Sequence, residues 1–181
     1  AEQMAETDER TLRDTLGELV FGSGDQSLAE VVGGELTKQG KTLAVAESCT
    51  GGLLTKLLTD VAGASTYLTC GWVVYSNAAK IRELGVPADL IEQHGAVSEQ
   101  VARAMAEGAR QRAGTDFAIG ITGIAGPTGA SEQKPVGLVY IGVDSEHGCD
   151  IRRHHFSRDR DFVRIRAAHT ALNTLRLLLQ V

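Results

Sequence analysis

The sequence has few cysteines, and their spacing is not that of a metal site. Its 181 residues include only three, Cys49, Cys70 and Cys149, an odd number at wide intervals. Such cysteines form neither a disulfide framework nor the paired CxxC arrangement of a zinc site. We therefore expect a cytoplasmic protein in a reducing compartment, with no disulfide bonds, no metal and no metal-based cofactor.

Long apolar runs and an excess of basic residues are also missing. The most apolar stretch, residues 172–179, is interrupted by polar side chains and is far shorter than the roughly 18 residues that a membrane helix needs. The N-terminus carries no apolar signal region. Lys and Arg total 18 against 23 Asp and Glu, which gives a formal net charge of −5. The sequence therefore predicts no membrane partner and disfavours general binding of nucleic acid.

Glycine, in contrast, is abundant and unevenly distributed. The chain has 21 glycines against 3 prolines, and they cluster at 51–52, 120–129 and 137–148. Glycine concentrated in particular loops indicates backbone that takes positive φ or approaches another group closely. These loops are the first indication of a binding or catalytic site.

Short apolar runs alternate with amphipathic patterns along the chain. Strands are expected over 42–46, 67–75 and 116–121 and in a hairpin of 136–143 with 149–156; helices are expected over 1–20, 27–39, from 53, from 76 or 77, 88–93, 98–113 and 159–179. Strands separated by helices predict a largely parallel sheet that is covered on both faces. The expected fold is α/β, a three-layer α/β/α sandwich with a mostly parallel, mixed sheet. It comprises a helical extension over 1–25 and one domain over 26–181.

Three polar clusters directly follow predicted strands, at 48–52, 75–80 and 122–126. Sites in α/β sheets form beyond the carboxyl ends of the strands, so we expect these clusters to share one crevice. Ser48 precedes the start of a helix, where unpaired backbone N–H groups can stabilise an oxyanion. The alternative is that Ser48 or Thr50 only caps this helix.

A serine nucleophile needs a base, and Lys80 is a better candidate than any of the five histidines. A lysine that is shielded from water loses its charge more readily and can then accept a proton. An ordinary surface lysine is the plainer interpretation of Lys80. A second arrangement also stays open, in which Cys49 is the nucleophile and His94 is the base.

Five ordered motifs resemble the CinA C-terminal domain family, of the stand-alone nicotinamide-nucleotide amidohydrolase type. They are Ala46-Glu-Ser-Cys-Thr-Gly-Gly-Leu53, Tyr75-Ser-Asn-x-x-Lys80, His94-Gly-Ala-Val-Ser-Glu99, Thr122-Gly-Ile-Ala-Gly-Pro127 and Lys134-Pro-Val-Gly137. The resemblance covers roughly residues 27–180. It implies hydrolysis of the carboxamide of nicotinamide mononucleotide to nicotinate mononucleotide and ammonia, without metal or cofactor.

The resemblance also implies roles for individual residues. Ser48 matches the nucleophile, Lys80 the base and Tyr75 a hydrogen-bonding helper that relays or orients. Substrate contacts are implied for a second set of positions, namely Gly51, Gly52, Thr122, Gly123 and Arg160. Burial and the nearby Arg160 cation are both expected to lower the pKa of Lys80. Arg158 stands where the family pattern has glycine.

Two further interpretations need no reaction. The domain could be a catalytically silent nucleotide-binding or regulatory module, since every motif glycine could serve phosphate binding alone. An apolar sheet edge could instead serve only for dimerisation. A homo-oligomer is expected from the resemblance and from the apolar last helix, which carries Leu172, Leu175, Leu178 and Leu179.

Overall fold

A computed structural model of the chain describes residues 2–180, with the side chains of residues 2–4 and 6 outside the description. It contains a five-stranded sheet in the order β2-β1-β3-β4-β5. The strands are β1 (Leu43–Glu47), β2 (Leu68–Val73), β3 (Phe117–Gly123), β4 (Leu138–Ser145) and β5 (Gly148–His155). β1 pairs in parallel with both β2 and β3, whereas β4 and β5 are antiparallel to their neighbours. The predicted mixed α/β sheet is confirmed.

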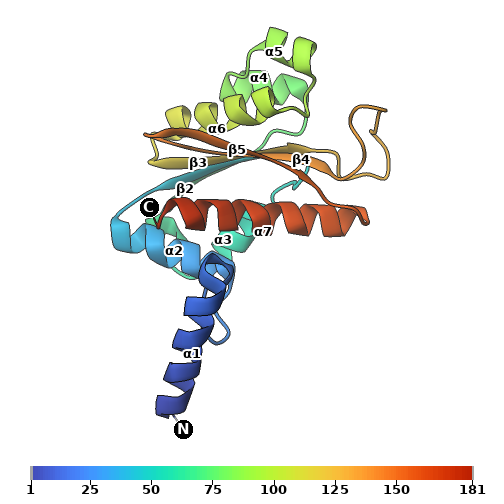
Figure 1. Ribbon diagram of the computed structural model, residues 1–181. Helices are drawn as coiled ribbons and strands as arrows, with labels where there is room; N and C mark the ends of the chain where they lie inside the picture. The colour runs from blue at the N-terminus through green and yellow to red at the C-terminus, as the bar shows by residue number, and fades with distance from the viewer. Residues whose placement is uncertain (1, 181) are drawn as a thin grey trace.

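Helices cover both faces of this sheet (Figure 1). α4 (Asn77–Leu84), α5 (Ala88–His94) and α6 (Glu99–Ala113) lie on one face. α2 (Leu28–Gln39), α3 (Leu53–Thr59) and α7 (Arg160–Leu178) lie on the other. Two short 3₁₀ turns, Gly17–Leu19 and Ala64–Thr66, connect neighbouring elements. The three-layer sandwich is therefore the observed architecture.

Local signals explain where several elements begin and end. Ser27 and Glu30 form the reciprocal capping box that starts α2, and Gly40 ends it in a left-handed conformation. The predicted strand from 136 begins instead at Leu138, because Gly137 takes φ +89° and a Cβ there would lie 2.0 Å from the Phe156 carbonyl oxygen. The predicted strand over 67–75 ends at Val73, since Ser76 caps α4 and directs the chain out of the sheet.

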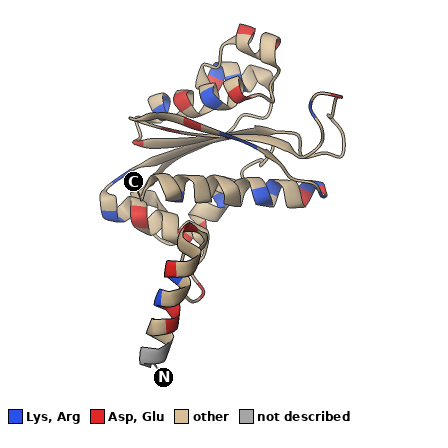
Figure 2. Cartoon of the chain, in the orientation of Figure 1, with Lys and Arg blue, Asp and Glu red and all other residues tan. Residues whose placement is uncertain are grey.

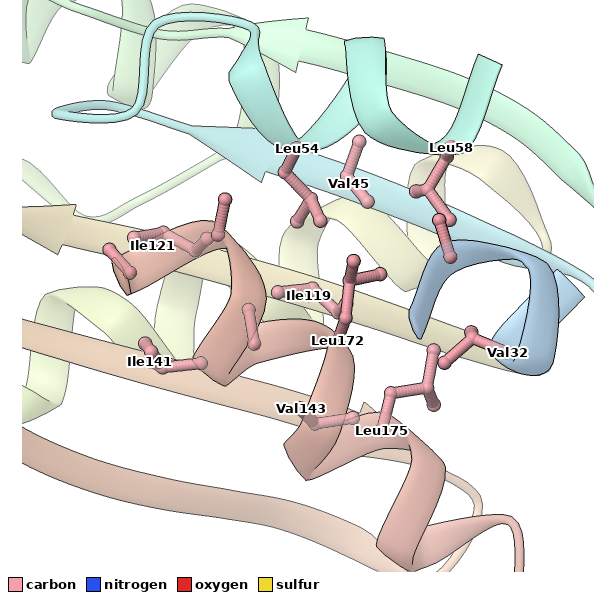
Figure 3. Packing of buried hydrophobic residues seen from close by; sticks show 14 of the residues in the cluster. Val32, Val45, Leu54, Leu58, Ile119, Ile121, Ile141, Val143, Leu172 and Leu175 are labelled. Carbon is pink, nitrogen blue, oxygen red and sulfur yellow. The ribbon is translucent and has the colours of Figure 1, made fainter. Parts of the chain in front are cut away.

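Two apolar clusters hold the layers together. The larger one packs the β1, β3 and β4 side chains against α2, α3 and α7, with Val45, Ile119 and Leu172 fully buried (Figure 3). The smaller one joins the opposite face to α6 through Ala44, Met105 and neighbours. Leu172, Leu175 and Leu179 are buried in the larger cluster and Leu178 packs against it. These leucines therefore provide no surface for the expected homo-oligomer.

The N-terminal extension forms a separate helix, α1 (Glu2–Leu16), which projects away from the sandwich in Figure 1. It ends at Leu16 and not at residue 20, because Gly17 takes φ +53°. Acidic and basic residues are spread along it (Figure 2), and Leu12 and Leu16 remain exposed. Among the described residues, no helix is long and apolar enough to cross a membrane.

Gly120 on β3 provides a test of the packing between sheet and α6. A Cβ at this position would lie 2.6 Å from the Ala102 carbonyl oxygen and 2.7 Å from the Ala106 nitrogen. Gly120→Ala should therefore lower the free energy of unfolding by about 1–3 kcal/mol in urea titrations. Gly34→Ala, on α2 with open space around the added carbon, should raise it by about 0.5–1 kcal/mol. Equal effects of the two substitutions would contradict this account of the packing.

Candidate active site

The three polar clusters meet in one cavity of about 310 Å³ at the carboxyl edge of β1 and β3. Parallel pairing of β1 with β2 and β3 brings their carboxyl ends to the same edge. The predicted site residues that line the cavity are Ser48, Tyr75, Lys80, Thr122, Gly123 and Arg160, together with Cys49 and Asn77. Gly51 and Gly52 belong to the turn after Ser48 and are not among the lining residues.

Ser48 and Lys80 are in direct contact inside this cavity. The Lys80 Nζ donates to Ser48 Oγ at 3.1 Å and to the Val74 carbonyl oxygen at 2.9 Å. Lys80 is 1% exposed and Ser48 is 8% exposed. Lys80 lies in the first turns of α4, which Ser76 caps by accepting from the Ala79 N–H. The interpretation of Lys80 as a surface lysine is therefore wrong.

Burial lowers the pKa of Lys80 below its ordinary value. Burial is the cause that lowers this pKa, and Arg160, expected to contribute, is not among its causes. A Cys49 thiolate would act in the opposite direction and raise the pKa of Lys80. Burial raises the pKa of Cys49 to about 12, however, so its thiol is neutral at pH 7 and this opposing effect is small.

The same burial argues against the Cys49–His94 arrangement. A thiol nucleophile acts as its thiolate, which the raised pKa of Cys49 disfavours. Among the described residues, His94 does not line the cavity and makes no hydrogen bond to Cys49. The carbonyl of His94 instead accepts a hydrogen bond from Lys134 Nζ. Ser48 is the better-placed nucleophile.

Glu47 is a site residue that sequence reasoning missed. Its fully buried carboxylate accepts from the N–H groups of Gly52, Leu54 and Thr55 and from the Thr55 hydroxyl, at 2.7–3.1 Å. The first turn of α3 is therefore occupied by a carboxylate, and the expectation that its N–H groups would face an oxyanion is wrong. A signal was present, because an acidic residue ends a buried strand directly before Ser48.

Other backbone donors remain next to Ser48. Among the described residues, no carbonyl or carboxylate oxygen accepts from the N–H groups of Cys49 and Thr50. Arg164 of α7 stabilises the turn that carries them, because its guanidinium donates two hydrogen bonds to the Thr50 carbonyl, at 2.9 and 3.3 Å. Gly51 and Gly52 take φ +61° and +95°, which lets the chain turn sharply into α3. These two N–H groups are the candidates for an oxyanion site.

The wall of the cavity opposite this turn comes from the end of β3. The Thr122 hydroxyl donates to the Ala96 carbonyl at 2.7 Å, which leaves its oxygen lone pairs as acceptors for a ligand. Gly123 has a packing reason to be glycine, because a Cβ there would lie 2.8 Å from the Leu138 carbonyl oxygen and 3.1 Å from Cys49 Sγ. Both residues were predicted site positions, and both reach the cavity.

Arg160 and Tyr75 meet across the cavity. Arg160 is the first residue of α7 and donates to the Gly126 carbonyl at 2.8 Å and to the Tyr75 hydroxyl at 3.2 Å. Tyr75 is 62% exposed and, in the described chain, hydrogen-bonds to neither Ser48 nor Lys80. A relay through Tyr75 is not supported, since Ser48 and Lys80 touch directly. The family pattern has glycine at position 158, but the backbone of Arg158 does not take the positive φ that would require glycine. The Arg158 guanidinium lies 4.7 Å from the centre of the Phe162 ring.

The fold and the cavity together define an α/β/α domain with a buried serine–lysine pair at the carboxyl edge of its sheet. The chain belongs to the CinA family, because the profile of the CinA C-terminal domain matches residues 25–179. Within residues 2–180, no group of three or more His, Cys, Asp or Glu side chains is placed to hold a metal ion.

Relatives and solved structures agree with this assignment. CinA-like proteins of Anaeromyxobacter sp. (strain K) and Geobacter sulfurreducens are 52% and 49% identical over 164 and 165 residues, 91% of this chain. The chain spans about 40% of the length of these relatives. The competence/damage inducible protein CihA of Agrobacterium tumefaciens is 38% identical, with TM-score 0.81 over 90% of this chain and 99% of that chain. A CinA superfamily protein of Escherichia coli is 29% identical, with TM-score 0.79 over 92% and 98%.

The lowered pKa of Lys80 predicts a pH dependence of stability. Between that value and the roughly 10.4 of an unfolded lysine, the unfolded chain binds more protons, so the free energy of unfolding rises with pH. Lys80→Met cannot ionise and lacks this contribution. The difference in unfolding free energy, wild type minus Lys80→Met, should therefore increase in urea titrations from about pH 6 to about pH 9.5.

Lys41→Met is the matched control for this measurement. The hydrogen bond to Asp116 raises the pKa of Lys41, so the stability from that contact is present throughout the same range and is lost only at higher pH. The corresponding difference for Lys41 should stay flat below about pH 9.5. A flat difference for Lys80 as well would contradict the assignment of a depressed pKa to this side chain.

Proposed function

We propose that this domain hydrolyses the carboxamide of nicotinamide mononucleotide to nicotinate mononucleotide and ammonia, without metal or cofactor. The observation that carries the proposal is the 3.1 Å contact between Ser48 Oγ and the buried Lys80 Nζ. Membership of the CinA family supports it. The choice of substrate and of reaction follows from the resemblance of the motifs, and the chemistry of the pair is compatible with both.

The first half of the reaction acylates the serine. Neutral Lys80 accepts the proton of the Ser48 hydroxyl while Ser48 Oγ attacks the carboxamide carbon. The carbonyl π electrons move to oxygen, and the N–H groups of Cys49 and Thr50 bind the resulting oxyanion. One Lys80 N–H stays on the Val74 carbonyl, which holds the nitrogen in place with its lone pair available to Ser48.

The second half releases both products. The Lys80 ammonium donates its proton to the amide nitrogen, the C–N bond breaks, and ammonia leaves an ester on Ser48. Lys80 is then neutral again and takes a proton from a water molecule that attacks this ester. Return of this proton to Ser48 Oγ frees the carboxylic acid, which ionises to nicotinate mononucleotide in water. The cycle needs a lysine that is neutral for part of its time near pH 7, and burial lowers the pKa of Lys80 in the required direction.

In this proposal the phosphate of the mononucleotide binds on the Arg160 side of the cavity. Arg160 presents a guanidinium there, beside the glycine-rich loop that contributes Gly126 and Gly129 to the lining. A guanidinium with neighbouring backbone N–H groups is a common arrangement for phosphate recognition. The contact of Arg160 with the exposed Tyr75 hydroxyl would be exchanged for phosphate oxygens when substrate binds.

The second candidate function is a catalytically silent nucleotide-binding or regulatory module. The same Arg160 and glycine loop would then hold the nucleotide without turnover. Ammonia release from nicotinamide mononucleotide separates the two functions in one assay. Binding of the mononucleotide with no ammonia above the uncatalysed rate would establish the silent module.

Substitution of the two neighbouring nucleophiles tests the serine mechanism. Ser48→Ala should lower the rate of ammonia release by more than about a thousandfold, because it removes the attacking oxygen. Cys49→Ala should stay within about tenfold of the wild type, since its thiol is neutral and performs no step. Both variants should unfold near the wild-type urea concentration. Retained activity in Ser48→Ala with loss in Cys49→Ala would overturn the mechanism.

Removal of the guanidinium tests phosphate recognition. Arg160→Ala should lower kcat/KM for nicotinamide mononucleotide by about 10- to 100-fold, the effect of losing a charge-assisted hydrogen bond. The phosphate-free riboside should be affected much less. Arg158→Ala is the matched control, because that side chain stacks on Phe162 and does not line the cavity. An equal loss on both substrates would show that Arg160 does not recognise the phosphate.

A further inference from the structure

The turn between β1 and α3 contains one peptide unit that is held at both ends, the unit between Thr50 and Gly51. Its N–H donates to the Ser48 carbonyl at 3.1 Å. Its C=O accepts from Arg164 Nη2 at 2.9 Å, from Arg164 Nε at 3.3 Å and from the Leu53 N–H at 3.3 Å. The buried Thr50 hydroxyl has no hydrogen-bond partner among the described residues. Arg164 is therefore the side chain that fixes this peptide unit.

Arg164 makes this contact from a rigid base. It lies on α7, where the neighbouring Val163 and Ala167 are fully buried in the larger apolar cluster. The carboxylate that it approaches, Asp161 Oδ1, is 3.6 Å away on a side chain that is 82% exposed. An exposed ion pair of this kind contributes little. The guanidinium thus directs two charge-assisted hydrogen bonds at a neutral backbone carbonyl of the turn.

We propose that Arg164 is a positioning residue, which keeps the N–H groups of Cys49 and Thr50 in place for the oxyanion. This role rests on the proposed serine mechanism but not on the identity of the substrate. Without the guanidinium, only backbone contacts of 3.1 and 3.3 Å would hold the unit between Thr50 and Gly51. Glycine tolerates the backbone rotation that flips such a unit. A flip would break the Gly51 hydrogen bond that closes the turn on Ser48.

Arg164 and Arg160 contact different parts of the site, although they lie one turn apart on the same side of α7. Arg160 lines the cavity and donates to the Gly126 carbonyl and the Tyr75 hydroxyl. Arg164 is not a lining residue and donates to the Thr50 carbonyl instead. A group that contacts substrate changes its binding, whereas a group that positions donors for the transition state changes kcat. The two arginines should therefore differ in their effects on KM and kcat.

Steady-state measurement of ammonia release tests this role. Arg164→Ala should lower kcat by about 10- to 100-fold and leave KM within about threefold, with the same loss for nicotinamide mononucleotide and its riboside. Arg164→Lys keeps a cation that can donate to the same carbonyl and should recover part of this loss. The pH midpoint of kcat/KM should not move, because Lys80 stays buried. Arg166→Ala, at an exposed position on the same helix, is the matched control and should behave as the wild type.

A second measurement needs no nucleotide and uses phenylmethylsulfonyl fluoride, a reagent for activated serines. Ser48 Oγ forms a bond to sulfur, fluoride leaves, and Lys80 takes the serine proton. Negative charge grows on a sulfonyl oxygen as this bond forms, so the rate depends on the same backbone N–H groups. Mass spectrometry should show labelling of the wild type at Ser48 and a rate about 10- to 100-fold lower in Arg164→Ala. Arg166→Ala should be labelled at the wild-type rate, and Ser48→Ala should not be labelled.

The labelling rates decide the role of Arg164 separately from the reaction. Three results would each overturn the role: Arg164→Ala labelled as fast as the wild type, a loss of rate that Arg164→Lys does not reduce, or a wild type that is not labelled at Ser48. A wild type that is labelled but releases no ammonia from the mononucleotide would reject the proposed reaction alone. In that case a slower labelling of Arg164→Ala would still support the positioning of the turn by Arg164.

Discussion

The parallel pairing of β1 with both of its neighbours is the constraint on which the site depends. Glu47 at the end of β1 is in register with Val73 on one side and Ile121 on the other. The residues that follow these three positions, Ser48, Val74 and Thr122, therefore come to the same edge, although they lie far apart in the sequence. Ser48 and Val74 leave the sheet there, whereas Thr122 still belongs to β3. No loop has to reach across the molecule to bring the serine to its lysine.

Burial of Lys80 at this edge of the sheet favours the neutral form of its amine. Lys80 is enclosed by apolar and neutral groups, and its two hydrogen-bond partners, Ser48 Oγ and the Val74 carbonyl, are both uncharged. A buried ammonium without a carboxylate partner is unfavourable, so the neutral amine gains relative to the charged form. The buried carboxylate of Glu47, directly before Ser48, is engaged by four donors at the start of α3. The helix start thus holds the anion while the lysine remains free to act as a base.

Much of this arrangement was predictable from sequence. The remainder depends on which groups a side chain meets in the folded chain, which the sequence alone does not specify. The order of strands and helices, the mixed sheet and the meeting of the polar clusters follow from apolar periodicity and from the rule for strand ends. The role of Glu47 did not, because a carboxylate can accept from any nearby donor and only the turn through Gly51 and Gly52 brings α3 to it. The leucines of α7 misled for a similar reason. An apolar helix pattern does not show whether its cover comes from its own sheet or from another chain.

The absence of charge over residues 61–79 connects the site to the sheet edge. This stretch forms β2 and leads through Val74 into α4, so it provides much of the wall around Lys80. An acidic side chain there would stabilise the ammonium form and raise the pKa of Lys80. A basic one would act in the opposite direction and favour the neutral amine. The lack of acidic residues in this stretch therefore agrees with a neutral lysine beside it.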